Sequence, residues 1–216
     1  MLLPSRLIRA LSLVSFPVLV ACGAGTSTQT PARVDGTLAG QPFAAADAIS
    51  AVNGNTAGSA AYVVISDDTG LCPLYTSVED GGTAATQPGV TSIKILAVVL
   101  TVIDVATNRA AAPTGPSTFD IIDPSVLGSG SPSDHVGLVQ YLVADQAGNE
   151  SSACSMGKSG TVTLTSADGN AFAGAGDVTM DCGDRLTFQF DAAPCAALET
   201  PQGSSVYGGG LPDAGL

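Results

Sequence analysis

The side chains able to do chemistry are few in this chain, apart from its carboxylates. Among 216 residues there are five cysteines and one histidine, against 19 acidic and 7 basic residues. Thiols can carry lipid, pair as disulfides or bind metals, a histidine can act as a base, and carboxylates can bind Ca²⁺. Which of these roles applies depends on where each residue falls along the chain.

Cys22 directly follows a short apolar stretch near the N-terminus. The largely apolar run at 10–21 has 12 residues, which is too short for a membrane helix of about 20 residues and matches a signal-peptide core. The run ends in Leu19-Val20-Ala21-Cys22, which resembles the lipobox of bacterial lipoproteins. The resemblance implies a diacylglycerol thioether on the Cys22 thiol, cleavage after Ala21, and acylation of the new amino group.

This processing predicts both the location of the mature protein and its net charge. Several acyl chains would hold the mature domain stably on a membrane; the alternative is an ordinary secretory signal in which Cys22 is incidental. Within the resemblance, Gly23 indicates the outer membrane of the cell envelope, because Asp at that place retains enterobacterial lipoproteins in the inner membrane. Removal of Arg6 and Arg9 leaves 5 basic and 19 acidic residues, a net charge of −14. That charge disfavours docking on anionic lipid or nucleic acid.

Composition excludes several classes of protein. Charged residues make up 12 % of the chain, about half the usual share, and 7 scattered basic residues cannot build the basic face of a nucleic-acid binder. A hydrophobic content of 45 % and a mean hydropathy of +0.35 can bury a core, unlike a disordered polyelectrolyte. The 26 glycines and 13 prolines, with so few charges, do not suit a helical bundle.

His135 is the only histidine, within Ser133-Asp134-His135. A hydrolase triad needs a nucleophile, a base and an orienting acid, and no GxSxG motif is present in the sequence. Adjacent side chains on a strand or turn point in different directions, so we do not expect Asp134 and His135 to form a dyad. We interpret His135 as a surface turn residue just before a strand, and assign no catalytic residue.

The carboxylates are candidates for Ca²⁺ binding, but most of them stand where turns favour them. Calcium needs six to eight converging oxygens, and no DxDxDG loop is present. Asp177 and Asp181 share one strand face, with Asp184 in the next turn, so these three are the candidate metal ligands. We otherwise expect solvated turn acids, no metal and no cofactor. The other carboxylates considered are Asp67, Asp68, Glu79, Asp80, Asp120 and Asp123.

The elements that must position these residues are strands. Apolar and β-branched runs, or strict alternation as in GTVTLTS at 160–166, are separated by turn residues such as Asp168-Gly169-Asn170. Roughly eight or nine short strands predict an all-β antiparallel sandwich, or a small open barrel. Segment 93–105 is expected to be a long central strand buried on both faces. The strands include 34–43 (with a turn), 60–66, 93–105, 136–145, 160–166, 171–181 and 184–191.

Three segments do not have the pattern of a regular strand. Gly174-Ala175-Gly176 interrupts its strand and predicts a bulge or bend. Segment 44–51 stays ambiguous. Segment 72–78 is a short helix or a turn packed over one open end of the sandwich.

The last three strands form a predicted meander, and this arrangement constrains the cysteines. With Cys22 lipidated, the remaining four allow three pairings in an exported protein. Cys154 and Cys182 fall at one end of the meander and Cys195 at the other, more than about 20 Å away, whereas a disulfide tolerates a Cα separation of at most about 7 Å. We therefore predict Cys154–Cys182, which leaves Cys72–Cys195. A metal site is disfavoured, because no CxxC pair is present.

The same C-terminal region carries a second resemblance. Cys154, then GTVTLTS, then DRLTFQFDAAPC at 184–195 resemble the C-terminal half of small predicted bacterial lipoproteins, whose hairpins end in a GxFDAxxC pattern. The resemblance covers about a quarter of the chain. It implies a β-rich half and no assigned activity.

The domain organisation follows. We expect a signal peptide at 1–21, a lipidated flexible tether at 22–33, a β-sandwich domain at 34–198 and a disordered tail at 199–216. The function expected is a lipid-anchored envelope protein with a non-enzymatic structural, adhesive or binding role. Its partner is the membrane through the lipid, and no protein or ligand partner is indicated. The alternatives are a small-ligand or Ca²⁺-binding module using loops at one end of the sandwich, and an enzyme of unrecognised type.

Overall fold

The computed structural model describes residues 31–55, 58–79, 92–104, 106–107, 109–126, 133–145, 150–151 and 154–199. These residues are mostly in strands, so the all-β prediction is confirmed. The predicted signal peptide, the tether up to residue 30 and the tail beyond residue 199 lie outside the described residues. The strands are β1 (Ala32–Leu38), β2 (Gln41–Pro42), β3 (Asp47–Asn55), β4 (Gly58–Ser66), β5 (Ser92–Asp104), β6 (Arg109–Ala111), β7 (Ser117–Ile122), β8 (His135–Asp145), β9 (Glu150–Ser151), β10 (Gly157–Asp168), β11 (Ala171–Met180) and β12 (Arg185–Pro194).

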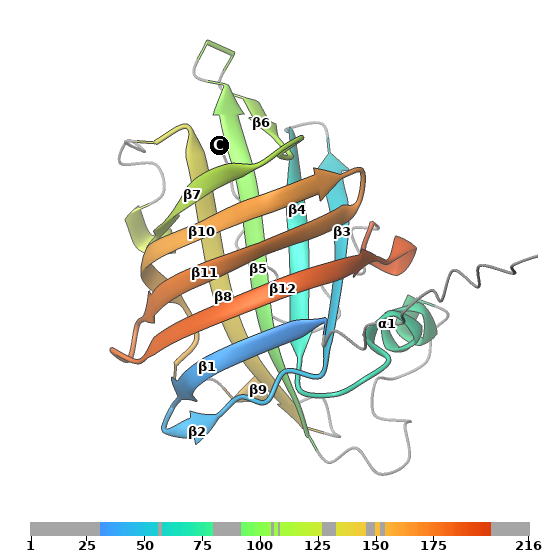
Figure 1. Cartoon of the computed structure of the whole chain (residues 1–216), viewed down its shortest axis with the longest axis vertical. Helices are drawn as coiled ribbons and strands as arrows, with labels where there is room; N and C mark the ends of the chain where they lie inside the picture. Colours follow the sequence, from blue (N-terminus) through green and yellow to red (C-terminus); the bar gives the residue numbers. More distant parts are fainter. Residues whose placement is uncertain are drawn as a thin grey trace, which may run out of the picture.

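The strands form two layers that cross at a steep angle in Figure 1. The front layer contains β7, β10, β11, β12 and β1, with the short β2 beside β1; the back layer contains β8, β5, β4 and β3, with β6 and β9 at its ends. Neighbouring strands within each layer run antiparallel, apart from a single β4–β6 pair. The predicted C-terminal meander is therefore present as β10, β11 and β12.

The two layers are joined into a closed mixed barrel, so the predicted antiparallel sandwich is wrong, and the barrel given as its alternative is closed and not open. At one junction β7 pairs with β8 in parallel, and at the other β12 pairs with β3 in parallel. Each junction has two residue pairs: Asp120 with Val136 and Ile121 with Gly137, and Ala193 with Ile49 and Pro194 with Ser50. We call these junctions the β7–β8 seam and the β12–β3 seam. Since β11 also pairs with β12, the ring closes, with nine strands when β6 is counted.

Several strands differ from the sequence prediction. The ambiguous segment 44–51 contains most of β3, and β7 was not predicted at all. Its alternation is nevertheless regular, since Phe119 and Ile121 are buried while Thr118 and Asp120 are exposed. The predicted central strand at 93–105 is β5, which pairs with β4 on one side and β8 on the other.

The barrel interior is filled by side chains from both layers. Phe188 and Phe190 of β12 point inward, directly across from Gly176 and Gly174 of β11. A Cβ atom placed on Gly176 would lie 2.3 Å from the Phe188 ring, and one on Gly174 would lie 3.0 Å from Phe190. These glycines do not mark the predicted bulge in β11, because the register with β12 is unbroken there; the irregularities lie in β10. They make room for the phenylalanine rings.

The helix α1 (Leu71–Glu79) packs on the outer wall of the back layer. Leu71, Leu74 and Tyr75 form a second apolar cluster with Val64, Leu142 and others on the outward side of the strands. Of the two alternatives for segment 72–78, a helix or a turn, the helix is present, but it packs on the outer wall and not over an open end. Asp47 at the start of β3 fixes where the helix begins, since its Oδ2 accepts the N–H groups of Gly70 (2.9 Å) and Leu71 (3.0 Å).

A small group of polar residues reinforces the β12–β3 seam. The buried hydroxyl of Ser50 lies 2.6 Å from the carbonyl oxygen of Asn170, in the β10–β11 turn, and 3.1 Å from that of Ala192. The Asn170 side chain accepts the N–H of Val52 at 3.0 Å and donates to Glu199 at 2.6 Å. The turn of the front layer is thus bonded to a strand of the back layer.

The filled interior predicts that even one added methyl group is harmful. We expect Gly176→Ala to lower the free energy of unfolding by about 1–3 kcal/mol, because the new Cβ overlaps the Phe188 ring. The matched control is Ala175→Ser, on the outward side of the same strand, which should stay within about 0.5 kcal/mol of wild type. Combining Gly176→Ala with Phe188→Leu should cost less than the two single losses added. Urea unfolding measures all four; equal stabilities of Gly176→Ala and Ala175→Ser would contradict this packing.

The seam contacts predict a second stability effect. Asn170→Ala leaves the Val52 N–H without its acceptor, and we expect the free energy of unfolding to fall by about 1–3 kcal/mol. Asp168→Ala, an exposed change in the same turn, should have an effect within about 0.5 kcal/mol. Chemical denaturation of both variants checks this, and similar losses for the two would show that the turn, and not the seam contact, is responsible.

Candidate functional site

The four cysteines described by the structure pair as predicted. Cys72 in α1 bonds to Cys195 after β12, with Cα atoms 5.6 Å apart, and Cys154 bonds to Cys182 in the β11–β12 turn, with Cα atoms 5.1 Å apart. The meander explains this, because β12 carries the chain from the turn holding Cys182 to the opposite side of the layer before Cys195. Each disulfide lies near a place where the two layers meet.

The three carboxylates considered as metal ligands do not come together. Asp177 on the outer face of β11 receives two hydrogen bonds from the Arg185 guanidinium, at 2.8 and 2.5 Å, and this contact lowers the pKa of Asp177. Asp181 accepts a hydrogen bond from Ser155 at 3.3 Å. Asp184 lies beside Cys154, with its Oδ2 3.9 Å from that sulfur. Asp177 does lie on a strand face, as the alternation of the sequence predicts, but the side chain it binds is that of Arg185.

Asp134 and His135 do contact each other, contrary to the sequence prediction. Asp134 Oδ1 lies 2.9 Å from His135 Nδ1, and this hydrogen bond lowers the pKa of Asp134. Asp134 precedes β8 in a bend, so its side chain can turn back to the ring instead of alternating with it. The ring packs on Phe119, with centroids 5.3 Å apart. The neighbouring Ser133 hydroxyl contacts the His135 main chain, at 3.1 and 3.2 Å, and the His135 ring contacts the Asp134 carboxylate.

A half-buried carboxylate lies at the end of the back layer near the β1–β2 hairpin. Asp67 accepts the Lys94 N–H at 2.7 Å, and burial raises the pKa of this carboxyl despite that bond. Burial also raises the pKa of the Tyr141 phenol, and the negative charge of Asp67 adds to the effect. Tyr141 contacts Phe43 edge to face, with centroids 6.2 Å apart, while the Lys94 ammonium donates to the Pro42 carbonyl at 3.1 Å. The sequence indicates a turn acid and a possible Ca²⁺ ligand at Asp67, but it does not predict the burial of this carboxyl, because that depends on distant strands.

The raised pKa of Asp67 predicts a pH-dependent loss of stability. The folded state holds this proton more tightly than the unfolded chain, so ionisation lowers the free energy of unfolding as the pH rises above the unfolded value of 3.8. Asp67→Asn keeps an acceptor for the Lys94 N–H without the charge. We expect it to be at least as stable as wild type at pH 7, with the difference vanishing below about pH 4.

An opposite-sign control is available in Asp104, whose pKa is lowered by hydrogen bonds from Thr107 and from the main chain. The ionised Asp104 stabilises the folded state above its unfolded pKa, and this stabilisation is lost as the pH falls. Asp104→Asn should therefore be less stable than wild type at pH 7. Urea titrations at pH 3, 5 and 7 separate the two. A loss at pH 7 in Asp67→Asn as large as that in Asp104→Asn would refute the burial effect.

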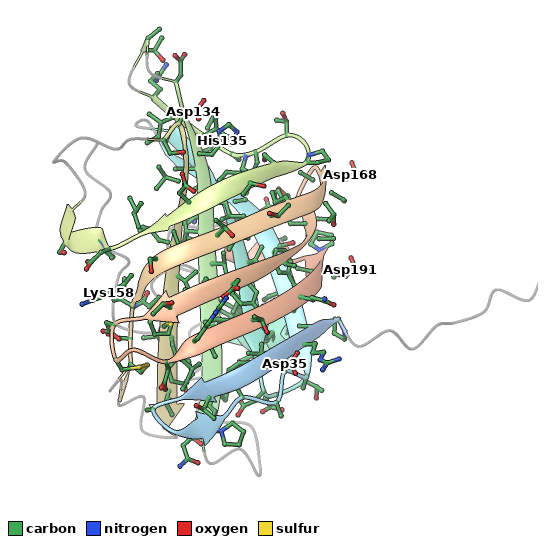
Figure 2. The ribbon with its side chains drawn as sticks, turned by 60° about the vertical axis from the view of Figure 1, so that its left-hand side comes forward. Asp35, Asp134, His135, Lys158, Asp168 and Asp191 are labelled. Atoms are coloured by element: carbon green, nitrogen blue, oxygen red, sulfur yellow. A yellow bond between two sulfur atoms is a disulfide. The ribbon has the colours of Figure 1, made fainter. Side chains whose placement is uncertain are left out.

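The outer face of the front layer carries an open hollow of about 750 Å³. Its floor includes Ala173 and Ala175, and polar side chains from β12 and β1 surround it, among them Gln189, Asp191 and Arg33. Arg33 pairs with Asp35 at 2.9 Å, and both side chains are largely exposed. In Figure 2, Asp35, Asp168 and Asp191 lie along one side of this layer. The lining is therefore mixed, with small apolar residues beside polar side chains, and the hollow is open to contacts from outside the barrel.

No family model matches the chain, and neither a curated protein nor a solved structure matches it. None of the helices in the described residues is long and apolar enough to cross a membrane. The class that the geometry defines is a closed, mixed β-barrel with a filled interior and two disulfides.

Proposed function

We propose that this protein is a lipid-anchored module of the bacterial cell envelope that acts through the outer surface of its barrel, in a structural or binding role. The observation that carries the proposal is the filled interior. Inward-facing phenylalanines occupy the space left by Gly174 and Gly176, and the polar side chains around the hollow face outward. A partner would therefore meet the protein on the outside.

The N-terminal sequence supports the proposed location at the membrane. Cys22 follows an apolar run in a lipobox-like sequence, and β1 begins at Ala32, so about ten residues separate the anchor from the barrel. Ten residues of a small, polar linker composition would span roughly 20 Å, which would keep the domain close to the membrane surface. The two disulfides suit an oxidising compartment outside the cytoplasm. Gly23 favours the outer membrane within the lipoprotein resemblance.

The charge supports a partner other than an anionic polymer. A mature chain with 5 basic and 19 acidic residues is repelled by anionic lipid headgroups and nucleic acid. Two of the described basic residues on the front layer, Arg33 and Arg185, are already paired with Asp35 and Asp177. The lipid, and not electrostatic attraction, would hold the domain on the membrane.

Lipidation is tested by replacing the thiol that would carry it. In bacteria grown with an alkyne-tagged fatty acid, the wild-type full-length protein should be labelled and should partition with membranes. Cys22→Ser should lose the label and leave the membrane fraction, because a hydroxyl cannot form the thioether. Thr26→Ala, four residues further on, is the matched control and should behave as wild type. A labelled, membrane-bound Cys22→Ser protein would overturn the proposal.

A further inference from the structure

Three potential metal ligands meet at the β11–β12 turn. The sulfurs of Cys154 and Cys182 and a carboxylate oxygen of Asp184 all lie within 4.8 Å of one another. Within the part of the chain that the structure describes, this is the only group of three or more such side chains so placed. From the sequence, Asp184 was considered as a metal ligand together with other carboxylates. In the structure its neighbours are instead the two sulfurs. Sulfur with a carboxylate is a ligand set that suits Zn²⁺.

Main-chain hydrogen bonds hold these residues together independently of the S–S bond. The Asp181 N–H donates to the Met156 carbonyl at 2.7 Å, which fastens the segment after Cys154 to the turn. The Met180 N–H donates to the Asp184 carbonyl at 2.8 Å, which closes the turn itself. The two sulfurs and the carboxylate would therefore stay near one another if the disulfide were reduced.

We propose that the dithiol form of this turn binds one Zn²⁺ through both sulfurs and one carboxylate oxygen of Asp184, with water as the fourth ligand. Two thiolates on a tetrahedral zinc lie about 3.8 Å apart, and a thiolate and a carboxylate oxygen about 3.5 Å apart. The Cα atoms of Cys154 and Cys182 are 5.1 Å apart, and Asp184 Oδ2 is already 3.9 Å from the Cys154 sulfur. Side-chain rotation alone brings these atoms to the metal.

Zinc and the disulfide exclude each other, and a dithiol reductant of the thioredoxin class connects the two states. Its thiolate attacks the sulfur of the exposed Cys182, the S–S bond breaks, and the electron pair leaves on the buried Cys154 sulfur. The second thiolate of the reductant then releases Cys182 and forms the reductant's own disulfide. Two electrons pass to the turn, Zn²⁺ binds the two thiolates, and the two thiol protons of the reductant go to solvent.

The charges explain why a dication is required. Two thiolates beside the carboxylate of Asp184 would place three negative groups within a few ångströms, and this repulsion favours the protonated dithiol when no counter-ion is bound. Zn²⁺ removes most of that repulsion, so metal and reductant act together. The turn is then fixed in both states, by the disulfide or by the metal.

The experiment uses full-length Cys22→Ser protein, so that only the four disulfide cysteines remain. After anaerobic reduction with a phosphine, Co²⁺ is titrated as a spectroscopic substitute for Zn²⁺. The titration is repeated on a protein that also carries Cys72→Ser and Cys195→Ser, so that Cys154 and Cys182 are its only cysteines. We expect one equivalent of Co²⁺, a thiolate-to-cobalt charge-transfer band, tetrahedral d–d bands, and displacement by Zn²⁺. Asp184→Asn should weaken binding at least about tenfold, because it removes a direct ligand.

The matched control is Asp181→Asn in the same turn, which should bind Co²⁺ as tightly as its parent. Circular dichroism of each reduced sample reports the fold. If reduction unfolds the barrel, addition of Zn²⁺ should restore it, because the metal replaces the disulfide. The proposal is overturned by the absence of a charge-transfer band, by equal affinities of Asp184→Asn and Asp181→Asn, or by a reduced protein that stays unfolded with Zn²⁺.

Discussion

The front and back layers are closed into one ring by parallel pairing of only two residues at each seam. Within a layer, long antiparallel strands make each other's hydrogen bonds, so each layer is well determined by itself. Closure is different, because a two-residue pairing supplies few hydrogen bonds and needs other contacts to hold it. The shape of the interior and the position of every outward-facing residue depend on those contacts.

The chain reinforces the seams with chemistry other than strand pairing. At the β12–β3 seam, the buried Ser50 hydroxyl contacts the β10–β11 turn, and the Cys195 N–H donates to the Ser50 carbonyl at 2.8 Å. The Cys72–Cys195 disulfide then ties α1 to the end of β12. At the β7–β8 seam, a Cβ on Gly137 would meet the Ile121 side chain at 2.6 Å, so this glycine leaves room for the isoleucine. A disulfide typically contributes about 2–4 kcal/mol to the free energy of unfolding.

Closure also separates an apolar interior from a polar exterior. Two of the buried rings, Phe188 and Phe190, come from β12, whose alternate residues Gln189 and Asp191 line the outer hollow. The alternation of a strand therefore divides the protein into a packed core and a surface available to partners. The β11–β12 turn is a third region. There Cys154 and Cys182, 28 positions apart in sequence, are brought into contact by the meander and the segment before it.

Local patterns in the sequence determined the β class, most strands and, through the meander, both disulfide pairings, but left a helix and a turn as alternatives for the α1 segment. These follow from side-chain alternation and turn residues, which act between near neighbours. Only the tertiary structure decided that the layers close into a barrel, that Gly174 and Gly176 face phenylalanine rings, that Asp134 turns back to His135, and that Asp184 lies beside two sulfurs. Each of these depends on which distant strands become neighbours, and parallel pairing of two residues leaves no mark on the local pattern.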